Sequence, residues 1–307
     1  MSWDGSSLAS PAAYRGWGIA FGVLAVLAFS VRPILIKLSY AASPISPTTL
    51  LFLRMTLSLP FFLVIGWWLR NEQPRLTGRD WAHVALLGFL GYYAASFLDF
   101  IGLKYVGAGV GRLIMFLYPT LVLFLSFLFL HKKPSGSEIA ALVMSYAGIA
   151  LVVSSHASPA AQARLFLFGA LLIFGGALLY AVYLVVGSQV VNRVGSMRFT
   201  AYSMVVSALP ALLQFFILEP ASALELPASV WAYALVLATF STVLPVFLAA
   251  EALKRIGASH FALIGAVGPV SVAVTSAIGL GEPFTWVQAL GGLLVISGVL
   301  LVSLKRS

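Results

Sequence analysis

LKYVGAGVGRLIMFLYP, residues Leu103–Pro119, returns 150 residues later as LKRIGASHFALIGAVGP, residues Leu253–Pro269. Leucine, lysine, glycine, alanine, leucine, isoleucine and proline recur at identical offsets without a gap. Each copy predicts the end of one apolar helix, a very tight turn at Lys-x-x-Gly-Ala, and a second helix that proline interrupts. An internal repeat is the signature of a repeated structural unit. The chain is therefore expected to consist of two related halves.

The composition of the 307-residue chain is that of a membrane protein. Hydrophobic residues make up 61% of it and charged residues 9%, whereas soluble domains carry about 25% charged residues. Apolar runs of about 20 residues, long enough to cross a bilayer, follow one another almost without pause. We therefore predict an all-α integral membrane protein that crosses the cell (inner or plasma) membrane many times. Because the chain contains no cysteine, it has neither disulfides nor thiolate metal sites.

Short polar patches separate ten apolar segments, and each segment is expected to be one transmembrane helix. The predicted helices cover residues 15–40, 48–69, 80–104, 107–130, 135–155, 164–190, 198–218, 229–254, 257–280 and 284–304. The two closest pairs of segments meet at residues 104–107 and 254–257. Merging either pair would create a helix of about 50 residues and about 75 Å, which is too long for one crossing.

The positions of lysine and arginine predict the orientation, because cytoplasmic loops are enriched in both residues. With the N-terminus inside, twelve of them face the cytoplasm: Arg15, Arg70, Arg75, Arg79, Lys132, Lys133, Arg193, Arg198, Lys254, Arg255, Lys305 and Arg306. Lys104 and Arg164 then fall outside. Both termini are therefore expected in the cytoplasm, with residues 1–14 as a disordered tail. This distribution also explains the net charge of +9 without nucleic acid as a partner.

The repeat extends beyond the opening stretch. Trp81-Ala82 recurs as Trp231-Ala232, again 150 residues apart. The unit therefore contains five helices, and because five is odd, the second copy must enter the membrane from the opposite side. Inverted repeats are typical of secondary transporters, whose substrates bind near the midplane between the halves. The expected organisation is a five-helix repeat at 15–155, an extracellular linker at 156–163 and an inverted five-helix repeat at 164–304.

The repeated motifs resemble those of a known superfamily. Leu103-Lys104, Gly107-Ala108 and Pro119, with their partners in the second copy, resemble the turns of the drug/metabolite transporter superfamily and, more narrowly, of its EamA-type branch. Gly279-x-Gly281-Glu282-Pro283 is similar to that family's ending. The first copy departs from the pattern, because Lys132-Lys133-Pro134 stands where the family usually has a glutamate before the proline. The resemblance extends to the aromatic amino-acid exporters of the YddG type, and it implies export of amino acids, related metabolites or drugs.

Four charged residues inside the predicted helices are candidates for substrate binding: Arg32, Arg54, Asp99 and Arg112. A charge in the bilayer costs about 2.5–3.5 kcal/mol on insertion scales, so such residues are functional candidates by default. Asp99 and Arg112 lie equally far from the first turn and therefore at the same depth. One interpretation is an Asp99–Arg112 ion pair that locks the hairpin. The other is an outer vestibule where Arg32 and Arg54, which have no acidic partner nearby in sequence, receive a carboxylate.

Hydroxyl and aromatic residues near the predicted midplane complete the candidate substrate site. They are Ser30, Tyr92, Ser96, Tyr180, Tyr183 and Thr242. Tyr92, Ser96 and Asp99 follow the spacing i, i+4, i+7 and therefore share one helix face. Tyrosine rings and hydroxyls at this depth suit an amphipathic ligand. The alternative is that these residues form ordinary hydrogen bonds between helices.

Four further residues are candidates for gating or coupling. Pro119 and Pro269 each remove a helix hydrogen bond near midspan, which allows bending or ligand contact, although a static kink explains them equally well. Glu251 and His260 flank the second turn at equal distance in the predicted inner half. They could form a proton-linked gate, because histidine titrates near neutrality. The alternative is that both are interface residues solvated from the cytoplasm.

These observations predict a secondary transporter that exports small amphipathic metabolites, above all aromatic or neutral amino acids, by alternating access between two halves. Two alternatives stay open: efflux of toxic cationic drugs, and a passive facilitator or channel. An intramembrane enzyme is disfavoured, because the sequence contains no cluster of His, Asp and Glu at one interface, no HExxH and no phosphate-loop motif. We therefore expect a small-molecule substrate and the lipid bilayer as partners, without a cofactor or a metal.

Overall fold

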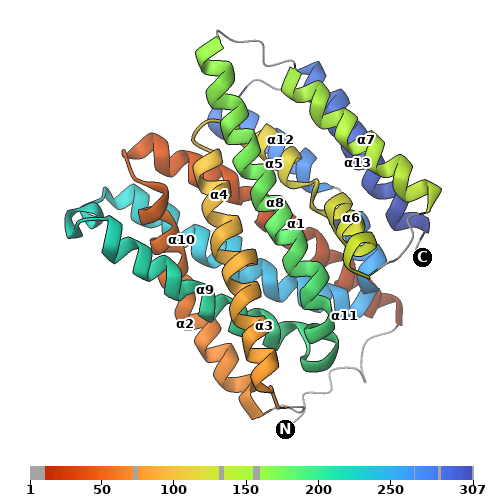
Figure 1. Cartoon of the computed structure of the whole chain (residues 1–307), viewed down its shortest axis with the longest axis horizontal. Helices are drawn as coiled ribbons and strands as arrows, with labels where there is room; N and C mark the ends of the chain where they lie inside the picture. The colour runs from red at the N-terminus through yellow and green to blue at the C-terminus, as the bar shows by residue number, and fades with distance from the viewer. Residues whose placement is uncertain are drawn as a thin grey trace.

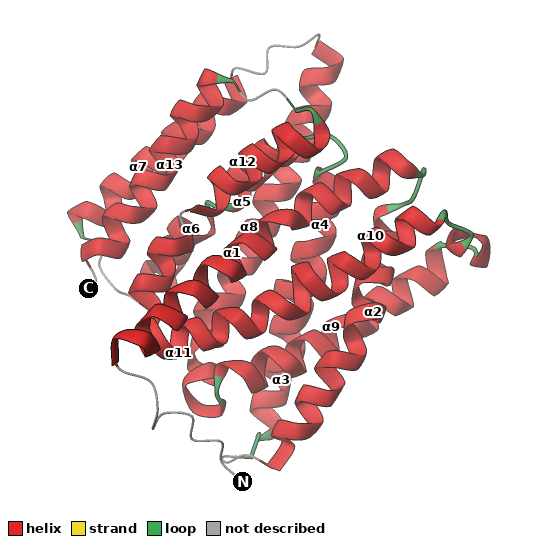
Figure 2. Cartoon of the chain, turned by 180° about the vertical axis from the view of Figure 1, so that it is seen from behind, coloured by secondary structure: helices red, strands yellow, loops and turns green. Residues whose placement is uncertain are grey.

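A computed structural model describes residues 11–71, 75–130, 135–154, 160–265, 267–282 and 285–305 of the chain. All regular elements within these ranges are helices (Figure 1, Figure 2). The first half contains α1 (Pro11–Ala42), α2 (Pro47–Trp68), η2 (Leu69–Asn71), α3 (Gly78–Gly88), η3 (Phe89–Ala94), α4 (Ala95–Gly102), α5 (Ala108–Met115), α6 (Tyr118–Leu130) and α7 (Gly136–Ser154). The second half contains α8 (Ala160–Val194), α9 (Ser196–Leu218), η4 (Ala221–Leu224), α10 (Ala228–Ala238), η5 (Thr239–Val243), α11 (Leu244–Gly265), α12 (Val267–Leu280) and α13 (Trp286–Lys305).

The helices account for all ten predicted membrane segments. Seven stretches are long and apolar enough to cross a membrane: Tyr14–Ala42, Pro47–Asn71, Gly78–Gly102, Ala108–Leu128, Gln162–Gly187, Ser196–Leu218 and Ala228–Ala249. Three shorter apolar helices complete the set: Gly136–Val152, Val267–Leu280 and Trp286–Gly298. The prediction of an all-helical membrane protein is therefore confirmed.

The packing of the helices follows the repeat. α2 lies against α9, and α7 lies against α13 (Figure 2), so equivalent helices of the two halves pair with each other. α1 packs on α10 and α11, and its equivalent α8 packs on α3 and α4. α3 contacts α9 in the same way that α10 contacts α2. These reciprocal contacts are those expected of two inverted repeats.

Glycine permits the closest of these contacts. A β-carbon on Gly148 of α7 would lie 2.5 Å from the carbonyl oxygen of Gly291 in α13. A β-carbon on Gly298 of α13 would lie 2.8 Å from the carbonyl oxygen of Ala141 in α7. Gly148 and Gly298 are 150 residues apart, as are Ala141 and Gly291, so the two contacts are equivalent. Small residues that let backbones approach are typical of helix interfaces in membranes.

Each half contains a π-helical segment in its third membrane span. η3 covers Phe89–Ala94, and η5 covers Thr239–Val243. The two segments begin 150 residues apart. The predicted helices at 80–104 and 229–254 are therefore present but interrupted. Such π-turns are rare and occur frequently at functional positions.

The first predicted turn is confirmed. α4 ends at Gly102, and α5 begins at Ala108. Between them, the amide of Tyr105 donates a hydrogen bond to the carbonyl oxygen of Gly102 (3.0 Å), and that of Lys104 donates to the carbonyl oxygen of Ile101 (3.1 Å). The stretch that opens the sequence analysis thus forms a hairpin of two helices.

The helix predicted at 107–130 is divided in two. α5 ends at Met115, and α6 begins at Tyr118. Pro119 stands in the first turn of α6, and Pro269 stands in the first turn of α12. A proline in the first turn of a helix sacrifices no intrahelical hydrogen bond. The two prolines therefore start helices instead of kinking them.

The second predicted turn, at residues 254–257, is wrong. α11 runs as a helix from Leu244 to Gly265. It bends around α1 instead: a β-carbon on Gly22 would lie 3.6 Å from Cβ of Ala252 and 2.9 Å from Cδ1 of Ile264. A straight helix would separate these two residues by about 18 Å. The change of direction therefore occurs between Ala252 and Ile264 without a break in the helix.

A carboxylate explains the difference between the two copies. Glu282 reaches from the second half to the N-terminus of α5, where its oxygens accept from the N–H groups of Ala108 (2.9 Å) and Gly109 (3.3 Å). The residue 150 positions earlier is Lys132, and an ammonium group cannot accept a hydrogen bond. A turn between helices leaves the first N–H groups of the next helix without partners. In the first copy Glu282 accepts from these N–H groups. In the second copy the chain continues as a helix, so the corresponding N–H groups lie inside a helix and need no such acceptor.

Helix extends into both regions that were expected to be irregular. α1 begins at Pro11, within the predicted tail, and α8 begins at Ala160, within the predicted linker. The remaining parts of these regions, residues 1–10 and 156–159, lie outside the described residues.

Replacement of glycine by alanine is expected to change stability in opposite directions at two positions, because only one of them lies in the contact between α7 and α13. Gly148→Ala places a β-carbon against a backbone oxygen and is expected to lower stability by about 1–3 kcal/mol through overpacking. Gly16→Ala, at a helical position with no atom within 4 Å, is expected to raise stability by about 0.4–1 kcal/mol. Thermal unfolding of the purified variants in detergent measures both. A Gly148→Ala protein as stable as the wild type would contradict the close approach of α7 and α13.

Candidate functional site

A network of charged and hydroxyl side chains joins the two halves. Arg54 of α2 donates through Nε to Thr242 Oγ1 in η5 (3.1 Å) and through Nη1 to Ser96 Oγ in α4 (2.9 Å). Ser96 also accepts from Nη2 of Arg32 in α1 (3.2 Å). The same nitrogen of Arg32 lies 3.3 Å from Oδ2 of Asp99. We call these five residues the polar network. All five are sequence-predicted site residues, and the structure brings them together.

The two guanidinium groups of the polar network lie over the same aromatic ring. The Cζ atoms of Arg32 and Arg54 are 5.6 Å and 5.8 Å from the centre of the Phe100 ring, which is within the range of cation–π attraction. The hydroxyl of Tyr40 donates to the carbonyl oxygen of Phe100 (2.8 Å) and holds this part of α4 against α1. Arg54 is only 3% exposed. Two hydroxyls and a ring therefore replace the water that would otherwise solvate it.

The predicted Asp99–Arg112 ion pair is wrong. Asp99 pairs with Arg32, and Asp99 and Arg112, which are both described, form no salt bridge. Among the arginines that act electrostatically on Asp99, Arg32 has the largest effect, followed by Arg112 and Arg54. Arg32 thus has an acidic partner that is distant in sequence, whereas Arg54 has hydroxyl partners and no acidic one in the described chain. Equal depth on two sides of a turn does not determine which way each side chain points around its helix.

Arg112 is the charged residue that the site leaves without a partner. Its Nε is buried and makes no hydrogen bond, and its guanidinium forms no ion pair with any part of the chain that the structure describes. A β-carbon on Gly268 of α12 would lie 3.3 Å from its Nη2. Tyr118, Tyr180, Arg32 and Asp99 lie within electrostatic range of it. The residue as a whole is half-buried, and a partly buried charge without a partner makes this guanidinium a candidate to bind an anion.

Four tyrosines form a contiguous cluster next to Arg112. The hydroxyl of Tyr183 in α8 donates to that of Tyr92 in η3 (3.2 Å), and the two ring centres are 5.0 Å apart. Tyr183 stacks on Tyr180 at 5.8 Å, and Tyr180 meets Tyr118 of α6 edge to face at 5.3 Å. We call these four residues the tyrosine cluster. Tyrosine combines an apolar ring with a polar tip, so the cluster suits an amphipathic ligand.

Tyr118 is a site residue that the sequence prediction missed, although the repeat contains a signal for it. It precedes Pro119 in the first copy, and the equivalent residue of the second copy is Gly268. Arg112 is likewise matched by Ala262. Two of the divergent positions lie close together, because Arg112 lies against Gly268, the counterpart of Tyr118.

Each π-helical segment carries one predicted site residue. Tyr92 lies in η3 and Thr242 lies in η5, and they are 150 residues apart. The Oγ1 of Thr242 donates to the carbonyl oxygen of Leu237 (2.8 Å), five residues earlier, and accepts from Arg54. The two π-turns therefore present equivalent positions of the repeat, one to the tyrosine cluster and the other to the polar network.

The remaining candidates have structural contacts. Ser30 donates to the carbonyl oxygens of Val26 (2.8 Å) and Gly268 (3.3 Å), and so it ties α1 to the start of α12. Glu251 pairs with Arg255 one turn later in α11. The structure therefore offers Glu251 a partner other than His260, whose side chain lies outside the described residues.

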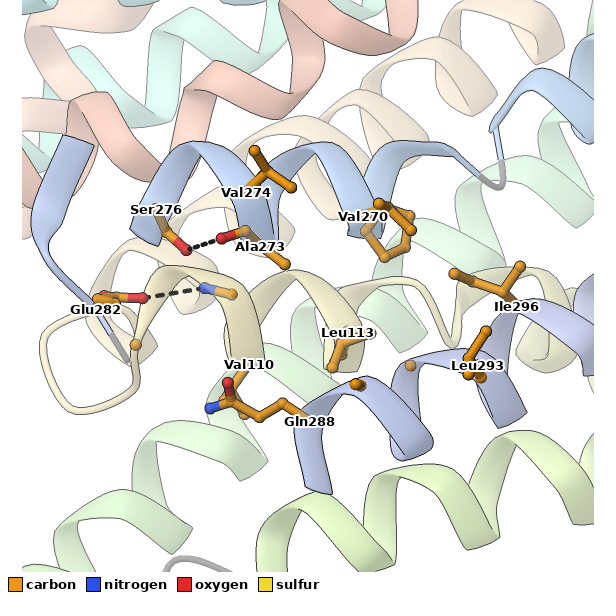
Figure 3. A pocket seen from close by; sticks show the side chains of 15 residues that line it. Val110, Leu113, Val270, Ala273, Val274, Ser276, Glu282, Gln288, Leu293 and Ile296 are labelled. Atoms are coloured by element: carbon orange, nitrogen blue, oxygen red, sulfur yellow. Dashed lines mark hydrogen bonds between the residues drawn. The ribbon is translucent and has the colours of Figure 1, made fainter. Parts of the chain in front are cut away.

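A cavity of about 400 Å³ lies between α5, α12 and α13 (Figure 3). Its walls are mainly apolar, and Val270, Val274 and Leu293 among them are 52%, 52% and 60% exposed. Glu282, which caps α5, lies at one end of it (Figure 3). No residue of the polar network or the tyrosine cluster lines this cavity. The cavity is therefore separate from the candidate site, and it opens between α5, α12 and α13.

A model of the EamA-like transporter family matches residues 16–154 and, a second time, residues 167–304. The chain belongs to the EamA-like transporter family. Membership makes it a multi-pass membrane transporter and not an enzyme, in agreement with the sequence prediction. The two matches fall on the two halves that the 150-residue repeat defines.

Curated relatives of this EamA-like transporter are also transporters. The uncharacterized transporter YcbK of Bacillus subtilis is 28% identical over 281 residues, which cover 89% of this chain and 88% of the relative. The uncharacterized transporter YyaM of the same organism is 28% identical over 265 residues, which cover 86% and 87%. A solved crystal structure superimposes with a TM-score of 0.66 over 95% of this chain and 98% of the other, at 18% identity. That likeness shows the fold alone.

The ion pair in the polar network predicts measurable coupling between its members. A double-mutant cycle with Arg32→Gln and Asp99→Asn is expected to give a coupling energy of about 1–3 kcal/mol, because each single change leaves the other group unpaired. Unfolding of the four proteins in detergent provides the measurement. The cycle between Asp99→Asn and Arg112→Gln serves as the control and is expected to give less. Stronger coupling to Arg112 than to Arg32 would contradict the observed pairing.

The cap that Glu282 places on α5 predicts a second, local effect. Glu282→Ala is expected to lower stability by about 1–3 kcal/mol, because the two N–H groups lose their acceptor. Hydrogen exchange at the amides of Ala108 and Gly109 should accelerate. Glu282→Gln, which keeps one acceptor oxygen, should lie between the wild type and Glu282→Ala. Removal of the exposed carboxylate of Glu225 is the matched control, and unchanged exchange in Glu282→Ala would rule out the cap.

Proposed function

We propose that this EamA-like transporter exports small amphipathic metabolites, with aromatic and neutral amino acids as the first class to test, by alternating access between its two halves. The polar network and Arg112 form the proposed substrate site, and the tyrosine cluster receives the apolar part of the substrate. The observation that carries the proposal is the half-buried side chain of Arg112, whose Nε is buried without a hydrogen bond and whose Nη2 lies against Gly268 at the start of α12.

The chemistry of Arg112 fits a carboxylate. A guanidinium binds a carboxylate through two parallel hydrogen bonds, and such charge-assisted bonds are roughly twice as strong as neutral ones. The nearby rings of Tyr118 and Tyr180 offer an apolar surface with hydroxyl tips. A substrate with a carboxylate at one end and a ring or aliphatic chain at the other therefore matches both parts of the site.

The position of the site supports alternating access. α1, α4 and α5 of the first half and η5, α8 and α12 of the second all contribute residues to it or contact them. In transporters with inverted repeats, rocking of one half against the other exposes a site at their interface to each side in turn.

Two alternatives receive less support. Efflux of cationic drugs requires acidic groups at the site, and Asp99 is already paired with Arg32. A channel, unlike a carrier, would show no stimulation of uptake by solute on the opposite side. Proton coupling stays a prediction, and a pH gradient across the membrane tests it.

Reconstituted transport tests the proposed function. The purified protein in liposomes preloaded with unlabelled solute is expected to show saturable, stimulated uptake of a carboxylate-bearing compound from a panel of amino acids, amphipathic carboxylates and cationic drugs. Loss of a charge-assisted contact of about 1.5–3 kcal/mol predicts that Arg112→Ala weakens apparent affinity about 10- to 100-fold. Arg164→Ala removes an exposed arginine of α8 and should behave as the wild type. Normal affinity in Arg112→Ala, or uptake of cations alone, would refute the proposal.

A further inference from the structure

The candidate site carries more positive than negative charge. Arg32, Arg54 and Arg112 are permanently charged, because a guanidinium does not lose its proton in proteins. Asp99 is the one carboxylate among them. The other acidic residues that the structure describes lie elsewhere: Asp80 pairs with Arg193, Glu138 bonds Ser135, Glu219 bonds Ser46, Glu251 pairs with Arg255, Glu282 caps α5 and Glu225 is exposed. Three cations therefore face one anion.

The uncompensated cations differ in their surroundings. Arg54 donates to the hydroxyls of Ser96 and Thr242 and lies over the ring of Phe100, so neutral groups stabilise its charge. Arg112 has no such contacts in the described part of the chain. Burial of an ion without compensation is strongly unfavourable. The site therefore has one position at which an external negative charge would offset a cation that no described group compensates, and that position is Arg112.

A ligand ammonium group finds no free carboxylate among the described residues of this site. Asp99 is the only carboxylate it could approach, and Asp99 pairs with Arg32 while all three arginines surround it. An ammonium near Asp99 would have to displace Arg32 or lie close to like charges, and like charges at short range in a medium of low polarity repel strongly. For a zwitterion, the unfavourable free energy at the ammonium group therefore offsets much of the favourable binding free energy at the carboxylate.

We infer that the preferred substrate is an amphipathic organic monoanion, with one carboxylate on Arg112, an aromatic or aliphatic body against the tyrosine cluster, and no ammonium group. This inference rests on the proposed function and narrows it. Among carboxylates of the same skeleton, the acid without an amino group binds more tightly than the amino acid. The same charge balance disfavours cationic drugs at this site.

Three ligands with the same phenyl ring and two-carbon arm test the inference. 3-Phenylpropionate is an anion, L-phenylalanine a zwitterion and 2-phenylethylamine a cation. Calorimetric titration of the purified protein at low salt is expected to show that phenylpropionate binds at least tenfold more tightly than phenylalanine and that phenylethylamine does not bind. Phenylalanine binding equal to or tighter than phenylpropionate binding would overturn the inference and leave the proposed function standing. Absence of binding by all three would overturn both.

A built-in carboxylate provides an independent test. Gly268 lies against Arg112 in the first turn of α12, so Gly268→Asp places a carboxylate where the ligand is expected. The variant should lose phenylpropionate binding at least tenfold relative to Gly268→Asn, which adds a side chain of the same size without charge, and should unfold at a higher temperature. Equal affinities in the two variants would overturn the inference. If neither variant folds, the same calorimetric titration of Arg112→Met provides the test. This variant should bind phenylpropionate no more tightly than phenylalanine. A retained preference for phenylpropionate would overturn the inference.

Discussion

A guanidinium buried in a bilayer has no water to solvate it, and the arrangement of the central helices follows from this constraint. Arg32 obtains a carboxylate from α4, and Arg54 obtains hydroxyls from α4 and η5. These contacts draw α1, α2 and α4 of one half and η5 of the other to a common point. Arg112 is the exception, because its Nε has no hydrogen-bond partner and it forms no ion pair with the described chain; for this reason we propose it as the group that binds the substrate.

The two halves share their packing and differ in their chemistry. Equivalent glycines bring α7 and α13 together, and equivalent π-turns interrupt the third span of each half. The charged residues of the site have no charged counterparts: Arg54 corresponds to Met204, Asp99 to Ala249 and Arg112 to Ala262. Close packing tolerates little change in volume, whereas a site that binds one molecule between two halves needs each half to contribute different groups.

Sequence patterns predicted the ten segments and the first hairpin, because apolar length and turn residues act locally. The pairing of Asp99 with Arg32 could not be predicted, because it depends on how α1 and α4 are rotated about their axes. The continuation of α11 as a helix in place of a second turn could not be predicted, because both copies share the motif Leu-Lys-x-x-Gly-Ala. The cap that Glu282 gives to α5 is likewise a contact between segments distant in sequence, and its counterpart in the first copy is Lys132.

Two residues of the second half, Thr242 and Glu282, complete groups of the first half, namely the guanidinium of Arg54 and the N-terminus of α5. The first half has Tyr92 and Lys132 at the corresponding positions. A symmetric dimer of two identical first halves would therefore leave both arginines without the threonine hydroxyl and both α5 termini without a carboxylate. The second half therefore supplies hydrogen-bonding groups that the first half lacks. A second copy of the first half could not take its place.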